Sequence, residues 1–149
     1  MGFSNIALTI AGSDSGGGAG IQADLKTFAF HCVHGTSAIT CITAQNTLGV
    51  NQVIKINSDL IKAQIEAIVT DINIKAVKTG MLFDEEIIIA VSQQIKQWKL
   101  SQLVVDPVMV SRTGVKLIDE GKIASLKTNL IPQALIPYMK GLKKIDITS

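Results

Sequence analysis

Apolar positions follow two patterns along this chain, short unbroken runs and longer segments with an apolar residue every three or four positions. The run over residues 6–11 stops at Gly12, which predicts a buried strand. The segment 21–29 carries its apolar residues at i, i+4, i+7 and i+8, which predicts a helix with one buried face. The chain therefore opens with a strand, a glycine-rich loop and a helix.

The same alternation continues to about residue 136. Segments rich in β-branched or apolar residues predict further strands over 36–44, 74–79, 103–105 and 134–136. The segments between these runs have helical periodicity and begin at side chains that can cap a helix, namely Ser58 or Asp59, Asp84 and Asp119. Strands that alternate with amphipathic helices predict an α/β fold, a mostly parallel sheet with helices on both faces.

Composition narrows the class of protein. The 149 residues are 47% apolar and 17% charged, which excludes a disordered chain, and the net charge of +2 is spread too evenly for a nucleic-acid surface. The longest apolar run, 87–91, is far below the roughly 20 residues that span a bilayer, so we expect no membrane segment. With no secretory signal pattern, we expect a cytoplasmic protein. Cys32 and Cys41 lack the paired spacing of a zinc site and are interpreted as buried free thiols.

Glycines and polar residues gather where the predicted strands end, at 12–20, 45–46, 79–81 and 106–108. Ligands of parallel sheets bind outside the carboxyl ends of the strands, so we expect these segments to meet at one crevice. The glycine loop fits neither a phosphate-binding Walker loop nor a dinucleotide fingerprint, because the required Lys and the final Gly or Ala are missing. It is either a close approach of backbone to ligand or a plain tight turn.

Four segments carry a resemblance to a known family. They are AGSDSGGGAGIQADLKT at 11–27, TAQNT at 43–47, KTGML at 78–82 and VDPVM at 105–109. Together they resemble the bacterial hydroxymethylpyrimidine/phosphomethylpyrimidine kinases of thiamin biosynthesis, and the similarity runs from about residue 6 to residue 136. The resemblance implies a ribokinase-like fold, ATP with Mg²⁺, and phosphorylation of 4-amino-5-hydroxymethyl-2-methylpyrimidine and then of its monophosphate.

The resemblance also implies roles for single residues. Gln45 would be the main contact to the pyrimidine, since an amide offers a donor and an acceptor side by side. The residues implied around the ring are Gly12, Ala19, Met81 and Val108. Each has a structural alternative: Gln45 could only tie strand ends together, and Met81 could be plain core.

Two carboxylates are further candidates. Asp24, interpreted as lying in the first turn of the opening helix, contacts either ligand or the helix end. Asp106 resembles the family residue near magnesium and phosphate, where a carboxylate can organise a hydrated cation; the alternative is a turn residue. No firm metal ligand is assigned.

The chain also departs from the family pattern. The distal Gly-Thr-Gly-Cys type segment that supplies the base and an anion hole is missing, so no catalytic residue is assigned. The tail 137–149 does not resemble the expected continuation, which predicts a truncated ribokinase-like domain over 1–136 followed by a divergent tail. An unpaired sheet edge would then favour self-association, such as a homodimer.

Three functions remain open at this point: a thiamin-pathway pyrimidine kinase, a non-catalytic pyrimidine-binding fragment without the ATP half, and a ribokinase-like relative acting on pyridoxal or a sugar. The segments around Gln45 and Met81 favour the first.

Overall fold

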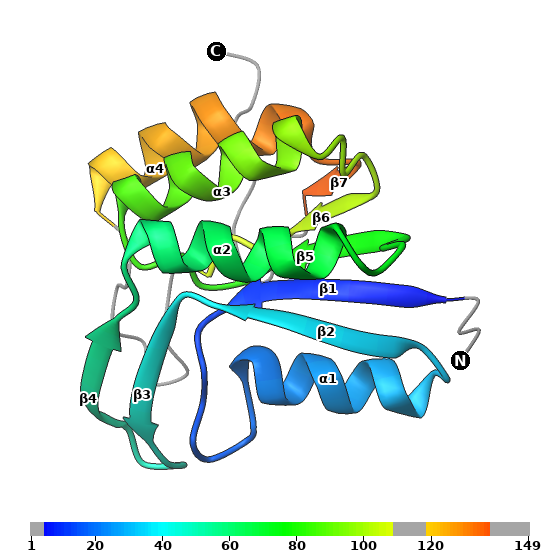
Figure 1. Ribbon diagram of the computed structural model, residues 1–149. Coiled ribbons are helices and arrows are strands. Elements are labelled where there is room, and N and C mark those ends of the chain that lie inside the picture. Colours follow the sequence, from blue (N-terminus) through cyan, green and yellow to red (C-terminus); the bar gives the residue numbers. More distant parts are fainter. Residues whose placement is uncertain (1–4, 109–118, 138–149) are drawn as a thin grey trace.

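The computed structural model describes residues 5–108 and 119–137, and its centre is one parallel sheet (Figure 1). The strands lie in the order β2 (His34–Ile39), β1 (Ile6–Ala11), β5 (Ala76–Thr79), β6 (Leu103–Val105) and β7 (Ile136–Pro137). Every neighbouring pair in this sheet is parallel. The predicted α/β class is therefore confirmed, and the last strand begins two residues later than expected.

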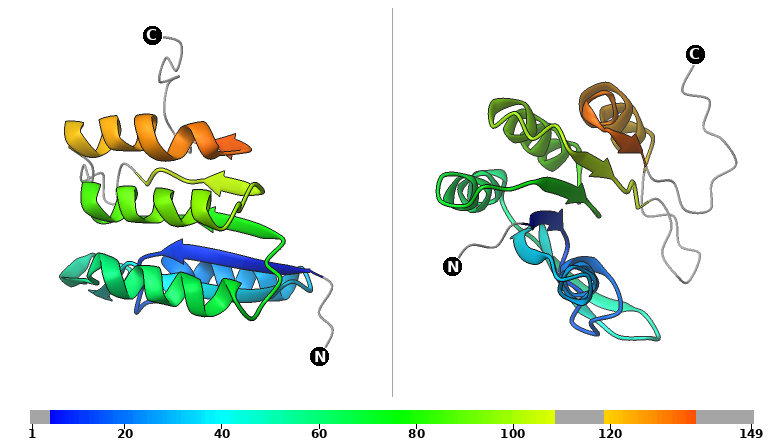
Figure 2. Two further views of the ribbon diagram at one scale, coloured as in Figure 1. Left: turned by 45° about the horizontal axis from the view of Figure 1, so that its top comes forward. Right: turned by 90° about the vertical axis from the view of Figure 1, so that its right-hand side faces the viewer.

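Helices cover both faces of the sheet (Figures 1 and 2). Helix α1 (Gly20–Phe30) packs on one face against β1 and β2, whereas α2 (Ser58–Val69) and α3 (Glu85–Gln97) lie on the other. Helix α4 (Glu120–Ser125) packs beside α3. The main core lies under α2 and α3, where Leu8, Ile10, Ile61, Ile65 and Ile87 are fully buried.

The strand order places a topological switch between β1 and β5. The chain leaves β1 through α1 to reach β2 on one side, and all later strands of the sheet are added on the other side of β1. Loops at such a point run in opposite directions and leave a crevice at the carboxyl ends of the two strands. The glycine loop follows β1 and Gly80 follows β5, so both border this crevice.

The segment 36–44, predicted as one strand, is divided between two sheets. Strand β2 ends at Ile39, and β3 (Cys41–Gln45) forms a separate antiparallel pair with β4 (Val50–Lys55), which was not predicted. The chain turns at Thr40, whose backbone N–H donates to Ala11 O at 3.0 Å while its Oγ1 donates to Met81 O at 2.8 Å. Gln45 therefore ends a hairpin strand rather than a strand of the parallel sheet.

Side-chain caps fix where the later helices begin. Asp84 and Asp119 cap α3 and α4 as predicted. Their carboxylates accept hydrogen bonds from Ile87 N and Lys122 N. Helix α2 differs, because Asn57 is its cap and not Ser58 or Asp59; Asn57 Oδ1 accepts from Leu60 N at 2.7 Å.

The two cysteines have different surroundings. Cys41 is fully buried, and this burial raises the pKa of its thiol above the ordinary value. Cys32 is exposed, so its interpretation as a buried thiol was wrong. It lies just past the end of α1 with a φ of 57°, a position outside the buried face of the helix.

Candidate functional site

The glycine loop after β1 is built around one buried carboxylate. Asp14 is 5% exposed and accepts hydrogen bonds from the backbone N–H groups of Gly16 at 2.8 Å, Gly18 at 3.0 Å and Ala19 at 2.8 Å. These donors are therefore engaged within the loop and are not directed at a phosphate. The loop is a rigid turn whose outer surface can still meet a ligand.

Two glycines at the ends of this loop are required by close contacts. Gly20 has a φ of +58°, and a Cβ there would lie 2.3 Å from Gly12 O. A Cβ on Gly12 would lie 2.7 Å from Cys41 Sγ. Gly12 and Gly20 thus let the end of β1, the start of α1 and the start of β3 approach one another.

Gln45 lies directly against the glycine loop. Ser15 Oγ lies 2.6 Å from Gln45 O, to which it donates, and 2.7 Å from Gln45 N, from which it accepts. The only side-chain hydrogen bond of Gln45 with a described residue is a long one, 3.4 Å from Thr43 Oγ1 to Oε1. The backbone of Gln45 is therefore fixed, while its amide retains hydrogen-bonding capacity for a ligand.

A small cavity opens at the carboxyl ends of β5 and β6. Its volume is about 140 Å³, below the roughly 300–1,000 Å³ of most ligand pockets, so it suits a small group. Its lining includes Val53, Thr79, Met81, Asp106 and Val108. Thr79 Oγ1 is buried and has no hydrogen-bond partner among the described residues.

The predicted ligand residues therefore divide into two groups. Met81, Val108 and Asp106 line the cavity. Gly12, Ala19, Asp24 and Gln45 do not line it; they belong to or contact the glycine loop and α1. The hydrogen bond from Thr40 to Met81 O links the turn between β2 and β3 to the loop after β5. Strand β3 leads from this turn to Gln45.

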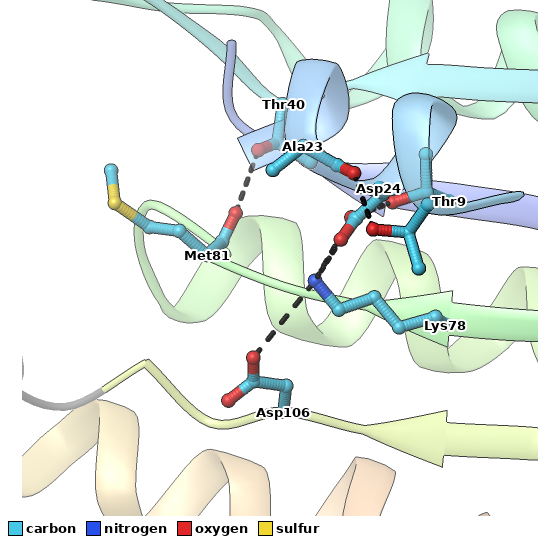
Figure 3. Close-up of polar contacts among 8 residues, drawn as sticks. Thr9, Ala23, Asp24, Thr40, Lys78, Met81 and Asp106 are labelled. Atoms are coloured by element: carbon cyan, nitrogen blue, oxygen red, sulfur yellow. Dashed lines mark hydrogen bonds and ion pairs between the residues drawn. The ribbon is translucent and has the colours of Figure 1, made fainter. Parts of the chain in front are cut away.

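Asp24, Lys78 and Asp106 form a charged cluster at the switch point (Figure 3). Lys78 Nζ lies 2.9 Å from Asp24 Oδ2 and 3.0 Å from Oδ1, and Thr9 Oγ1 donates to Asp24 Oδ2 at 2.6 Å. Asp106 Oδ2 is 3.9 Å from the same ammonium. The side chains of Asp24, Lys78 and Asp106 are 17%, 24% and 29% exposed, so the cluster is sheltered but open to a ligand.

Two details of this cluster differ from the sequence interpretation. Asp24 lies beyond the first turn of α1, so its carboxylate does not stabilise the helix end. Lys78 had no predicted role. The available signal was a charged residue beside Val77 near the end of a predicted parallel strand, which is unusual for a strand buried on both faces.

A cluster of metal-ligating side chains and a membrane-spanning helix are both absent from the part of the chain that the structure describes. Among residues 5–108 and 119–137, no three His, Cys, Asp or Glu side chains are grouped so that they could hold a metal ion. No helix within these ranges is long and apolar enough to cross a bilayer. Arg112 and Lys116, two basic residues of the polar segment after Asp106 in the sequence, lie outside the described residues.

Comparison with known proteins decides the family. Residues 14–138 match the model of a family described as phosphomethylpyrimidine kinase. The chain belongs to this family. It is 57% identical over 131 residues to the hydroxymethylpyrimidine/phosphomethylpyrimidine kinase of Synechococcus elongatus, covering 88% of this chain and 49% of that protein. The Bacillus subtilis kinase of the same name is 49% identical over 148 residues, with coverages of 96% and 55%.

Solved structures of kinases share the fold. The crystal structure of phosphomethylpyrimidine kinase from Clostridium difficile 630 superposes with a TM-score of 0.83 at 50% identity, covering 88% of this chain and 57% of that one. Bacillus subtilis pyridoxal kinase in complex with ADP gives a TM-score of 0.81 at 39% identity, with coverages of 96% and 58%. The ribokinase-like fold is thus confirmed, and the chain spans about half the length of the curated relatives that it matches.

Proposed function

We propose that this chain carries the pyrimidine-binding part of an ATP-dependent, cytoplasmic kinase of thiamin biosynthesis. The proposed substrates are 4-amino-5-hydroxymethyl-2-methylpyrimidine and its monophosphate, and the proposed unit is the amino-terminal part of one domain over 1–136. The observation that carries the proposal is the placement of Gln45 against the glycine loop in a member of this kinase family. The side-chain amide of Gln45 keeps hydrogen-bonding groups for a ligand, because its hydrogen bond with Thr43 is long.

Gln45 is the proposed contact to the edge of the pyrimidine. A glutamine amide can donate to a ring nitrogen and accept from the neighbouring amino group. Met81 and Val108 line the cavity at the ends of β5 and β6 and supply apolar walls for a flat ring. Gly12 and Ala19 contribute by close approach of the backbone, because the Ala19 N–H is already engaged by Asp14.

Asp106 is the proposed contact to Mg²⁺ and phosphate. Mg²⁺ is usually held by one or two carboxylates with substrate phosphates and water, so a single partly exposed carboxylate at a cavity fits a shared site and not a dedicated cage. Asp24 fits less well as a metal ligand, since both of its oxygens already accept from Lys78. ATP as donor is supported by relatives whose structures contain ADP or AMP-PCP.

The test is the affinity of the 149-residue chain for the hydroxymethylpyrimidine, measured by isothermal titration. We expect Gln45→Ala to weaken binding about thirtyfold, since two neutral hydrogen bonds are worth about 2 kcal/mol together. Gln52→Ala is the matched control, because Gln52 is an exposed amide on the neighbouring strand β4. Equal affinities of the two variants would refute the role of Gln45.

A non-catalytic pyrimidine-binding protein is the second candidate. It is favoured by the glycine loop, whose N–H groups at Gly16, Gly18 and Ala19 donate to Asp14 and are not directed at a phosphate. A coupled ATP-turnover assay separates the kinase from the non-catalytic protein, because steady product formation by this chain alone would exclude the non-catalytic protein. A relative that acts on pyridoxal is the third candidate, since pyridoxal kinases share the fold. Isothermal titration of the chain with pyridoxal tests it.

We also propose that two copies of the chain associate through the β3–β4 hairpin. In its antiparallel register Ile42 faces Ile54, and these side chains are 49% and 60% exposed. A two-stranded sheet is marginally stable alone and gains from an apolar partner surface. We expect light scattering at roughly 100 µM protein to show a dimer, and Ile54→Lys to shift it to a monomer. A wild-type chain that is monomeric at this concentration would refute the proposal.

A further inference from the structure

The ammonium of Lys78 has hydrogen-bonding capacity beyond Asp24. Lysine carries three N–H donors. Asp24 accepts at 2.9 and 3.0 Å through its two oxygens. A second charged neighbour, Asp106 Oδ2, is 3.9 Å away, which is an ion-pair distance but too long for a hydrogen bond.

The 3.9 Å gap between Lys78 Nζ and Asp106 Oδ2 is too short for an oxygen to lie within it, but one oxygen beside the gap can reach both atoms. An oxygen about 2.8 Å from each atom would subtend an angle of roughly 90° across a 3.9 Å separation, which is acceptable for a hydroxyl that accepts on one side and donates on the other. Ammonium can only donate and carboxylate can only accept, so the pair is complementary to an O–H group. It is less suited to a carbonyl, which cannot donate to Asp106.

The position of the gap connects it with the proposed ligand site. Asp106 lines the cavity together with Met81 and Val108, and Lys78 lies between Asp24 and Asp106 (Figure 3). Gly80 lies beside the ammonium, because a Cβ there would lie 3.1 Å from Lys78 Nζ and 2.8 Å from the Cβ of Ala11. The Lys78 ammonium donates to Asp24, whose carboxylate is fixed by a hydrogen bond from Thr9 Oγ1.

We propose that Lys78 and Asp106 together bind the hydroxyl group of the hydroxymethylpyrimidine. Lys78 donates to the hydroxyl oxygen, the hydroxyl donates to Asp106, and Asp24 is the positioning residue that orients the ammonium. This inference rests on the proposed function and names the groups that recognise the phosphoryl acceptor. It also assigns Asp106 a contact that exists without metal or nucleotide.

A purely structural role for Lys78 is the rival explanation. Asp24 is 17% exposed, and a sheltered carboxylate needs a partner whether or not a ligand binds. Removal of Lys78 would then weaken binding of any pyrimidine to the same extent. The two explanations differ in whether the loss depends on the ligand hydroxyl.

The experiment is a ligand-and-residue cycle on the 149-residue chain, by isothermal titration in EDTA without nucleotide. The ligands are 4-amino-5-hydroxymethyl-2-methylpyrimidine and 4-amino-2,5-dimethylpyrimidine, which lacks only the hydroxyl. Wild type should prefer the first by on the order of 10- to 100-fold, as expected for hydrogen bonds to charged groups. Lys78→Met and Asp106→Ala should each reduce this preference to less than about threefold.

Controls keep the outcomes separate. Lys75→Met removes an exposed lysine of the preceding segment and should retain the wild-type preference. If Lys78→Met does not fold by circular dichroism, Asp106→Ala decides, because Asp106 lies beyond the end of β6. A preference that persists in the folded variants, or wild type that binds both ligands equally, overturns the inference alone. Wild type that binds neither pyrimidine overturns the proposed function as well.

Discussion

Gly20→Ala should lower the free energy of unfolding by about 3 kcal/mol. The φ of +58° at Gly20 is the left-handed region, which costs a residue with a Cβ about 1–2 kcal/mol. The new Cβ would also lie 2.3 Å from Gly12 O and 3.2 Å from Asp14 N, and these backbone atoms cannot rotate away. Steric crowding of this kind typically adds about 1–3 kcal/mol. Urea denaturation followed by circular dichroism measures the change.

Gly49→Ala is the matched control for this result. A Cβ at Gly49 meets no atom within 4 Å, so we expect its free energy of unfolding to stay within about 0.5 kcal/mol of wild type. If Gly20→Ala were as stable as Gly49→Ala, the close contact between the start of α1 and the end of β1 would be absent from the folded protein.

The regular elements could be predicted because each has a strong local pattern. Residues 6–11 are apolar except for Thr9, as expected for a strand with neighbours on both sides, and β1 pairs with both β2 and β5. Asp84 and Asp119 precede helical segments and accept from the backbone three residues later. In these cases the residues that determine the structure are close in the sequence.

The hairpin could not be predicted, because its pattern depends on what lies on its two sides. In β4, the adjacent apolar residues Val53 and Ile54 are 37% and 60% exposed although Val53 also lines the cavity, so the sequence lacks the alternation that marks a half-buried strand. The end of β2 was also hidden. Thr40 is β-branched and so suits a strand, but its hydrogen bonds to Ala11 and Met81 set the turn.

Much of the candidate site could be inferred only by resemblance. The resemblance pointed to Gln45, and the structure explains why the glycine loop and Gln45 occur together, since Ser15 binds the Gln45 backbone. Lys78 could not be found this way. Its partner Asp24 is 54 positions away in the sequence, and the parallel pairing of β1 with β5 brings Lys78 within reach of Asp24 on α1.

Asp14→Ala should lower the free energy of unfolding by about 4 kcal/mol, the largest effect we expect from a single substitution. Its carboxylate is the acceptor for three backbone N–H groups in the glycine loop. A hydrogen bond to a charged group contributes about 1.5–3 kcal/mol, and part of the loss is recovered because water can reach the exposed side of the loop. Urea denaturation tests this, with Asp59→Ala as the control, because the Asp59 side chain is 92% exposed.

Asp14→Asn separates the charge from the shape of the loop. The amide keeps one acceptor oxygen of the same geometry, so we expect roughly half of the loss seen with alanine. Any variant that remains folded should also bind the hydroxymethylpyrimidine more weakly, because the loop presents Ser15, which fixes the Gln45 backbone. Asp14→Ala with wild-type stability would mean that the loop N–H groups have other partners, and a rigid turn beside Gln45 would no longer explain how the ligand edge is held.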